Sequence, residues 1–523
     1  MSNIASTPVS RRALIAGTGG LTLAGMLALA GCSNEPGSSA SKSGKFTGNL
    51  TFLLPGTIPT GWQNVLGAVN KQLKTDLGFT IQPQFISWAD YATQSLLKFT
   101  SGANFDTALQ ARWLNMTQLV ADKALVDVSG KVGQYKNLSA TVDSKILEAN
   151  KWGEGLYGIP QVNSAARLHH FGIRQDLADE LGFSEITDFD TLERFWYAVK
   201  QKKRGVIPFG LNTGSGRNTV FGPVTPTLNA WAWDNPNAFG WSFTGDSMLF
   251  AFAQDAATGG SSNPVPFWEQ EGVMDALNRV RKYNQDGIIN RDILNLDAKA
   301  EQGLFSAGKT ATTWAITDGT TSNFLTALRK AVPGAQMANV APLRGGLSAK
   351  PLQNFQADNF TVLNTRGQSN DAAMALQDWA SIKKNYDLLN YGIEGTDWAA
   401  QGDDGVEVKS AYNFPGFALA WRAPLFRNPS TMSPTEKTIF EWSKDTENFT
   451  LDPFASFIPD VEPVKTQNTQ MSAAMTQYAK PLFAGVVDVN KGLDNLKRAA
   501  DRAGLSKLQA EMAKQADAYI KKK

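Results

Sequence analysis

The sequence contains a single cysteine, Cys32, and only two histidines among its 523 residues. One cysteine cannot form a disulfide within the chain, and two histidines are too few for a histidine-based zinc site. The histidines, His169 and His170, are neighbours on an expected strand, so their side chains should point to opposite faces. Composition therefore excludes a disulfide framework, and we expect neither a metal site nor a cofactor.

An excess of charge of either sign is also missing. The chain has 50 basic and 48 acidic side chains, and the segment before Cys32 holds two of the basic ones and no acidic one. The rest of the chain is therefore formally neutral. Its longest basic run, Lys200–Arg204, is interrupted by Gln201. Because nucleic-acid-binding proteins usually carry a basic excess or a concentrated basic patch, we expect no nucleic-acid partner.

Long apolar segments are absent after residue 31. No stretch there approaches the roughly 18 consecutive apolar residues of a membrane-spanning helix. The apolar stretch near the N-terminus, Ala13–Gly31, has five glycines in nineteen residues and would make a poor spanning helix. Two arginines precede this stretch, and its last residues, directly before Cys32, are small. This order of basic, apolar and small residues is typical of a cleaved secretory signal.

Cys32 changes what this signal predicts. Residues 1–32 resemble the signal of a bacterial lipoprotein, in which the cysteine receives a diacylglyceryl group and becomes the first residue of the mature chain. Ser10–Ile15 also resembles a twin-arginine export signal. The alternative is a buried core cysteine behind a plain membrane helix, which the glycines make unfavourable. We expect removal of residues 1–31 and lipid anchoring on the extracytoplasmic face of the cell membrane.

Residues 32–45 are small and polar, and they predict a flexible linker to a folded part that begins near Phe46. Beyond it, short strand-like runs alternate with segments whose apolar residues are three and four positions apart, as in helices. The expected elements are strands at 50–54, 79–86 and 106–110 and helices at 62–77 and 90–100. This alternation predicts an α/β fold in which mainly parallel sheets are flanked by helices.

One motif invites a nucleotide-binding interpretation. Gly303–Thr310 matches the phosphate-binding pattern G-x-x-x-x-G-K-[ST]. A phosphate loop must follow a strand and open a helix, because the helix N-terminus supplies amides to the phosphates. Here a polar, helix-prone segment precedes the motif and a strand-like segment, 310–316, follows it. The sequence therefore predicts a helix-turn-strand corner with an exposed Lys309.

Signals for catalysis are few. No G-x-S-x-G elbow occurs, and Asp403-Asp404 stand between glycines in a pattern typical of a solvated turn. A pair of carboxylates that meets only in space, as in glycoside hydrolases, stays open as an alternative. The sequence itself gives no positive sign of an enzyme.

Tryptophans follow the first expected strands. Trp62 comes after the loop that follows strand 50–54, Trp88 follows strand 79–86, and Trp113 follows 106–110. Ligands of α/β lobes bind at the carboxyl ends of the strands, and a flat apolar ring suits the C–H face of a sugar. For each of them the alternative is a core position. For Trp62, which lies on the apolar stripe of its helix, neither alternative is favoured.

Polar side chains near the same loops could bind the hydroxyl groups of a sugar. These candidates are Asp106, Arg112, Gln161, Asn163 and Asp318. Further candidate ligand-binding residues are Asp358, Trp314 and two tryptophans of the aromatic-rich segment 205–270, Trp231 and Trp233.

Several segments together resemble the extracellular solute-binding proteins, family 1, of carbohydrate ABC importers. Leu156–Pro160 resembles the Y-G-I-P segment of that family, and Phe305–Ala311 followed by Trp314 resembles its F-x-x-G-K-x-A corner. Tyr391–Gly395 resembles a motif of the aldouronate- and oligogalacturonide-binding lipoproteins. That motif is usually followed by an aromatic or histidine-containing pair, whereas here Thr396-Asp397-Trp398 follows.

The resemblance implies a two-lobe periplasmic-binding-protein fold of type II, with crossings near 160–170, 310–315 and 355–362. On this basis we expect residues 46–162 with about 311–358 to form the N-terminal lobe. The C-terminal lobe would then comprise residues 163–310 with about 359–523.

The resemblance further implies a monomeric, non-enzymatic receptor. It would bind a mono- or oligosaccharide in the cleft between its lobes, close by hinge motion and dock on an ABC permease. One alternative is a surface-anchored glycoside hydrolase or lyase, and another is an importer receptor for peptides or other solutes.

Overall fold

The computed structural model describes residues 46–166, 168–212, 239–241, 243, 248–252, 262–317, 319 and 321–522. The predicted signal, Cys32 and the linker lie outside the described residues, as do Trp231, Trp233 and Asp318. Within the described part of the chain, no helix is both long and apolar enough to cross a membrane.

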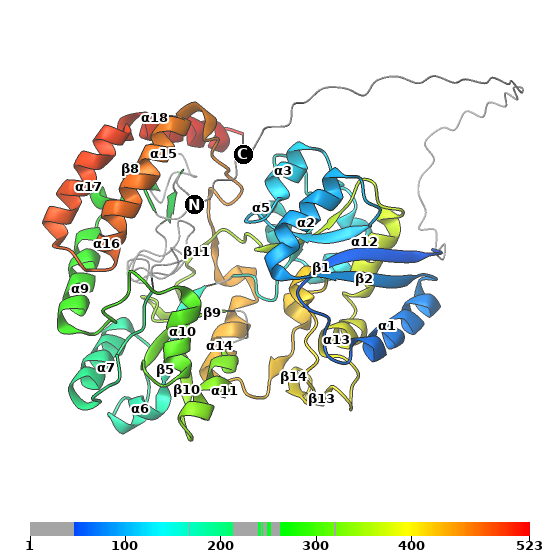
Figure 1. Ribbon diagram of the computed structural model, residues 1–523, viewed down its shortest axis with the longest axis horizontal. Helices are drawn as coiled ribbons and strands as arrows, with labels where there is room; N and C mark the ends of the chain where they lie inside the picture. Colours follow the sequence, from blue (N-terminus) through cyan, green and yellow to red (C-terminus); the bar gives the residue numbers. More distant parts are fainter. Residues whose placement is uncertain are drawn as a thin grey trace, which may run out of the picture. The chain divides into compact units, whose positions relative to one another are not determined.

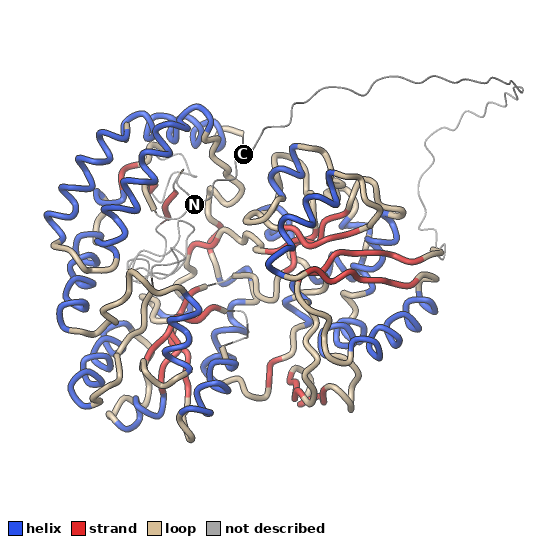
Figure 2. The backbone as a smooth tube through the Cα atoms, viewed as in Figure 1, coloured by secondary structure: helices blue, strands red, loops and turns tan. Residues whose placement is uncertain are grey.

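The first sheet contains five strands in the order β2-β1-β3-β12-β4. Figure 1 shows β1 and β2 side by side, and Figure 2 shows the strands in red. Its strands are β1 (Asn49–Pro55), β2 (Thr80–Ile86), β3 (Thr107–Gln110), β4 (Ile159–Gln161) and β12 (Asn359–Leu363). β1 is parallel to β2 and β3, whereas β12 is antiparallel to β3 and β4. The loops after β1, β2 and β3 and the loop before β12 therefore share one edge of the sheet.

Helices with amphipathic spacing accompany this sheet. In α1 (Trp62–Asp76) the residues Val65, Val69 and Leu73 are buried, because their spacing of four places them on one helix face. The other helices of this part are α2 (Trp88–Thr100), α3 (Met116–Ala121), α4 (Lys136–Thr141), α5 (Ser144–Ala149), α12 (Asn370–Trp379) and α13 (Lys383–Tyr391). α1 contacts α13 and α12 contacts α4, so residues 370–391 pack with the first sheet.

The second sheet contains three strands in the order β10-β5-β9. They are β5 (His169–Arg174), β9 (Thr312–Ile316) and β10 (Met337–Val340), and both pairings are antiparallel. The helices of this part are α6 (Gln175–Glu180), α7 (Phe189–Lys202), α9 (Val273–Asp286), α10 (Ala298–Ser306), α11 (Ser322–Ala331) and α14 (Pro434–Ser443). The expectation of mainly parallel sheets therefore fails for this sheet, because β9 and β10 both run against β5.

The pairing of β9 also differs from the expected division into lobes. That division assigned about 311–358 to the N-terminal lobe and about 359–523 to the C-terminal lobe. Instead β9 and β10 pair with β5, while β12 pairs with β3. The reason lies in tertiary packing: α10 contacts both β9 and α11, so β9 stays with these helices and pairs with β5. The crossing near 355–362 consequently leads back to the first sheet.

The Gly303–Thr310 motif lies in this unit, and the prediction for it is confirmed. α10 ends at Ser306, Gly308 takes the left-handed conformation with φ 70°, and β9 begins at Thr312. Phe305 is fully buried and Lys309 is exposed. The helix begins at Ala298, before the motif, and its C-terminal end forms the first part of the motif, so its N-terminus cannot supply amides to a phosphate held there.

Smaller elements complete the described part of the chain. Three short sheets consist of β6 (Phe239–Trp241), β7 (Phe250–Phe252) and β8 (Val265–Pro266), of β13 (Trp398–Gln401), β14 (Gly405–Val408) and β15 (Asn428–Pro429), and of β11 (Leu352–Gln353) and β16 (Thr450–Leu451). The C-terminal helices are α15 (Lys465–Ala474), α16 (Lys480–Phe483), α17 (Val489–Ala503) and α18 (Leu505–Ile520). α16 and α17 contact α9, which docks this helical end beside the second sheet (Figure 1).

Candidate ligand-binding site

The loops at the shared edge of the first sheet surround a pocket of about 540 Å³. Pro55 ends β1 and Gly56 and Thr57 follow it, while Ser87 and Trp88 follow β2. The opposite wall comes from α13 and from the segment 413–426, which supplies Phe414, Phe417, Trp421 and Phe426. Strand topology thus brings together residues that are more than 300 positions apart in the sequence.

Exposed aromatic rings form a ledge beside this pocket. Trp88 is 47% exposed and Trp113 is 54% exposed, although large apolar side chains are usually buried. The ring of Phe417 stacks on Trp88 with a centroid distance of 5.7 Å and an interplanar angle of 18°, and Trp113 lies 6.2 Å from Trp88. The Trp113 indole is held in place because its Nε1 donates to the backbone oxygen of Asp358 at 2.9 Å.

Such a ledge can bind a flat ligand with apolar faces. Contiguous exposed aromatic surface rimmed by polar groups marks a binding site more often than an accident of packing. The ring faces that remain open can cover the C–H face of a sugar, while amides and hydroxyls at the rim can bind its oxygens. Asn390 and Asn413 line the pocket and supply such amides.

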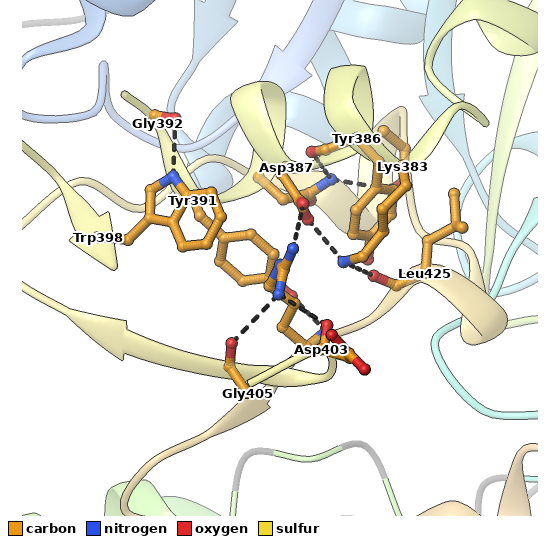
Figure 3. A network of polar contacts seen from close by, with 12 residues as sticks. Lys383, Tyr386, Asp387, Tyr391, Gly392, Trp398, Asp403, Gly405 and Leu425 are labelled. Atoms are coloured by element: carbon orange, nitrogen blue, oxygen red, sulfur yellow. Dashed lines mark hydrogen bonds and ion pairs between the residues drawn. The ribbon is translucent and has the colours of Figure 1, made fainter. Parts of the chain in front are cut away.

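A charged network supports the wall formed by α13 (Figure 3). Asp387 accepts from Arg427 Nη2 at 2.8 Å and from Lys383 Nζ at 2.8 Å, and Lys383 also donates to the Leu425 oxygen at 2.9 Å. The Tyr391 hydroxyl accepts from the Arg427 backbone amide at 2.8 Å. These bonds hold the 425–427 segment against α13, so the aromatic residues before it are fixed in position.

The segment after α13 depends on one glycine. Gly392 has φ 88°, and a Cβ there would lie 2.6 Å from Asp397 Oδ2. Asp397 uses that oxygen to accept from the Ile393 amide at 2.8 Å, and Trp398 Nε1 donates to the Gly392 oxygen at 3.0 Å. The Tyr391–Gly395 motif is therefore a tight turn that orients Tyr391 toward the pocket.

A second glycine allows the aromatic segment to approach α13. A Cβ at Gly416 would lie 2.0 Å from Asn390 Oδ1 and 2.9 Å from Trp421 Cδ1. Any side chain at this position would push the 413–417 segment away from α13. The pocket wall thus requires glycine at 416.

Two tyrosines of the pocket keep their hydroxyl protons. Burial raises the pKa of Tyr386 and of Tyr391 well above the usual value. Both phenols therefore stay neutral at physiological pH.

The described residues include no group of three or more histidines, cysteines, aspartates or glutamates that could hold a metal ion.

The fold agrees with that of known proteins. A carbohydrate ABC transporter substrate-binding protein of Streptococcus pneumoniae serotype 4 is 24% identical over 511 residues, covering 95% of this chain and 96% of that protein. The crystal structure of the N-glycan transport solute-binding protein NgtS from Streptococcus pneumoniae superposes with a TM-score of 0.72 at 18% identity, covering 90% of this chain and 99% of that chain. The fold is that of a solute-binding protein.

Two further comparisons refine this picture. A solute-binding protein of Bifidobacterium longum infantis, described as HMO-binding and associated with an ABC transporter, gives a TM-score of 0.63 at 16% identity, covering 90% of this chain and 99% of that chain. Residues 453–521 match a family model described only as a domain of unknown function, DUF3502. In this structure those residues form the helical end that packs beside the second sheet.

The structure brings some of the predicted ligand residues to the pocket. Trp88 lines it, and Trp113 extends the ledge. Asp358 is half-buried and accepts from Trp113 through its backbone oxygen, and Arg112 directly precedes Trp113 in the sequence. Gln161 and Asn163 are buried where the chain leaves β4, and Gln161 Oε1 accepts from the Trp421 amide at 3.0 Å. They lie behind the pocket wall.

Other predicted residues lie elsewhere. Trp62 is only 3% exposed and stacks on Phe414 at 5.4 Å, so it supports the pocket from the core. Asp106 precedes β3 at the opposite edge, where its carboxylate accepts from the amides of Thr51, Gln368 and Ser369. Trp314 lies in the core of the second sheet, stacked on Phe171 at 4.6 Å. No ligand role follows for these three from their positions.

The segment 386–426 was missed as a source of ligand-binding residues. It supplies Tyr386, Tyr391, Phe417 and Trp421, and its polar member Asn390. A composition signal was present, because residues 412–426 combine five aromatic residues with prolines and a glycine in a stretch without helical periodicity. Their position beside strands 50–54 and 79–86 depends on long-range packing, which no local pattern encodes.

Proposed function

We propose that this protein is the substrate-binding component of a carbohydrate ABC importer. It binds a mono- or oligosaccharide at the aromatic ledge and passes it to a membrane permease, without catalysing a reaction. The observation that carries the proposal is the exposed stack of Trp88, Phe417 and Trp113 at the carboxyl edge of the first sheet. The pneumococcal relative, which matches nearly the whole chain, supports the importer assignment.

In this proposal the sugar binds between two lobes. The first lobe comprises residues 46–162 and about 354–430, and the second comprises about 163–350 and 431–522. Contacts of α14 with β10 support the return to the second lobe after β15. The second lobe also reaches the pocket wall, because an ideal Cβ on Gly319 would lie 2.9 Å from the Phe426 ring. Closure of the lobes then covers the ledge and its ligand.

The ligand is best sought among oligosaccharides. NgtS has been crystallised in complex with Man1GlcNAc and with Man5GlcNAc. The resemblance of Tyr391–Gly395 to the aldouronate- and oligogalacturonide-binding group also favours a chain of several sugar units. A ledge of three neighbouring rings can contact more than one unit.

A glycan panel tests the proposal by isothermal titration calorimetry and thermal shift. It should contain N-glycan fragments, milk oligosaccharides, uronic-acid oligomers and, as a rival class, peptides. A ligand at 100 times its dissociation constant should add about 2.7 kcal/mol to the stability. Peptide binding without saccharide binding would reject the carbohydrate assignment. Release of new reducing ends from a polysaccharide would favour the surface-anchored glycoside hydrolase or lyase instead.

The membrane anchor is a separate part of the proposal. Lipidation of Cys32 after removal of residues 1–31 holds the receptor on the extracytoplasmic face, beside its permease. Cys32→Ala should move the protein from the membrane fraction to the soluble exported fraction while sugar affinity stays unchanged. Cys32→Ala that remains in the membrane fraction contradicts the anchor without affecting the sugar assignment.

A further inference from the structure

Three arginines near the ligand-binding edge differ in what accepts their hydrogen bonds. Arg427 pairs with Asp387 at 2.8 Å. Arg422 is fully buried and has only neutral acceptors, namely Ser381 Oγ at 2.9 Å, Gln161 Oε1 at 2.8 Å, Gln377 Oε1 at 2.8 Å and the Trp421 oxygen at 2.7 Å. Arg112 differs from both, because its Nε and Nη2 lie below the surface with no hydrogen-bond partner.

Arg112 lies two residues after Gln110, the last residue of β3, and directly precedes the exposed Trp113. Its guanidinium carbon lies 3.8 Å from the ring centroid of Trp152, so one face of the group is stacked on that indole. Burial lowers the pKa of Arg112 to about 10, which still leaves the side chain charged at neutral pH. The described residues provide it with no carboxylate partner.

Two buried N–H groups of a cation that lack acceptors cost free energy, so their presence calls for a reason. Stacking on Trp152 uses only the face of the guanidinium and leaves its in-plane N–H groups available. Nε and Nη2 lie along the same edge of the group and form a fork that fits two oxygens at once. Arg174 uses this same edge in the same protein, with Nε and Nη2 donating to the two oxygens of Asp176 at 2.9 and 2.5 Å.

We propose that Arg112 is a specificity-determining residue that holds one sugar unit by two adjacent oxygens along its Nε–Nη2 edge. This inference rests on the proposed function and adds to it the group that the sugar must present. The two oxygens come either from a carboxylate or from vicinal hydroxyls. Both nitrogens are buried in the structure described here, so binding at this edge requires lobe opening to expose it to the ligand.

Arg112→Gln and Arg112→Lys test the proposal against wild type with acidic and neutral oligosaccharides by calorimetry. Arg112→Gln should lower the affinity about tenfold or more, since it removes a charge-assisted pair of hydrogen bonds. Arg112→Lys should not restore it, because an ammonium group lacks the fork. A loss confined to acidic oligosaccharides identifies a carboxylate as the source, and a loss with neutral ones identifies vicinal hydroxyls.

Thermal unfolding without ligand provides the second readout. Removing an unpartnered buried charge should leave the melting temperature of Arg112→Gln equal or higher, whereas Arg422→Gln, which strips four acceptors, should lower it. The exposed Arg366 lies at the opposite sheet edge, so Arg366→Gln controls for the change in net charge. The inference about Arg112 is overturned if Arg112→Gln binds every saccharide with wild-type affinity, or if its melting temperature falls as that of Arg422→Gln does. Neither outcome affects the proposed function. A wild-type protein that binds no saccharide overturns the proposed function as well.

Discussion

Each of the two sheets carries a stack of aromatic rings, and exposure is what separates them. Beside the second sheet, Trp196 of α7 is 1% exposed, stacks on Phe209 at 4.7 Å and donates from Nε1 to Thr312 Oγ1 of β9 at 3.0 Å. At the edge of the first sheet Trp88 and Trp113 keep about half of their surface open. Stacking alone therefore does not mark a ligand site. A ring that has found a partner on one face and still leaves surface free does.

Local structure explains why the two stacks differ. Trp196 is at the centre of α7, on the apolar face that includes Leu192 and Val199, so it must point into the core. Trp88 is the first residue of α2, where the chain has just left β2. A residue at that position lies at the sheet edge, where Phe417 covers one face of the Trp88 ring and 47% of the side chain stays exposed. The comparison predicts that replacing the buried Trp196 mainly lowers stability, whereas replacing the exposed Trp88 mainly lowers ligand affinity.

The largest effect should come from the buried stack. Trp196→Ala removes a large ring from the core of the second lobe and its hydrogen bond to Thr312, so we expect a loss of about 3–5 kcal/mol in unfolding free energy. Urea denaturation followed by circular dichroism measures this change. Trp113→Ala, in which the removed ring is half exposed, is the matched control and should cost less than about 1 kcal/mol. Equal losses in the two variants would break the comparison.

Substitution in the exposed stack should affect binding more than stability. Trp88→Ala removes the central ring of the ledge, so we expect the sugar affinity to fall by about 1–2 kcal/mol, roughly five- to thirtyfold. The control is Leu97→Ala, because Leu97 is 63% exposed on the same helix and does not line the pocket. Isothermal titration calorimetry measures the sugar affinity of both variants. If Leu97→Ala weakens binding as much as Trp88→Ala, the ledge is not the ligand surface.

The sequence contained enough information for the first half of the site. Periodic apolar residues located β1, α1, β2 and α2, and the rule that ligands bind after parallel strands then selected Trp88 and Trp113. The sequence could not separate these two tryptophans from Trp62, whose spacing is that of a core residue, or from Trp314, which lies within the strand-like segment 310–316. Exposure depends on which distant segment covers each ring, and local patterns do not encode that.

The second half of the site was out of reach for the same reason. Tyr391 and Phe417 join the pocket because α13 packs on α1 and because residues 413–426 return to the edge of β1. The resemblance to a known family pointed to Tyr391–Gly395 but not to the pocket that it borders. The expected division placed β9 with the first sheet and β12 with the second, whereas each strand pairs with the other sheet. This error has the same origin, since three-dimensional packing decides which strands pair.

The smallest expected effect concerns a buried acid in the second lobe. Glu301 is fully buried, and its Oε1 accepts from Thr313 Oγ1 at 2.8 Å, while burial raises the pKa of this carboxyl to about 8. The folded protein therefore keeps a proton that the unfolded chain has lost above its usual pKa of about 4.5. The stabilisation is complete below about pH 4.5 and disappears as the pH rises toward 8, so we expect a fall of about 1 kcal/mol between pH 6 and 7.

Glu301→Gln isolates this contribution, because an amide keeps the size and one acceptor of the protonated acid but does not titrate. His170, whose pKa burial lowers to about 4, responds in the opposite direction and is common to both proteins. The difference between wild type and Glu301→Gln in urea midpoint, measured from pH 5.5 to 8, thus reports on Glu301 alone. Parallel pH profiles would mean that this carboxyl ionises in the folded state. The folded second lobe would then hold a buried charge near its aromatic core. Exclusion of water would no longer distinguish that core from the exposed aromatic ledge of the first lobe.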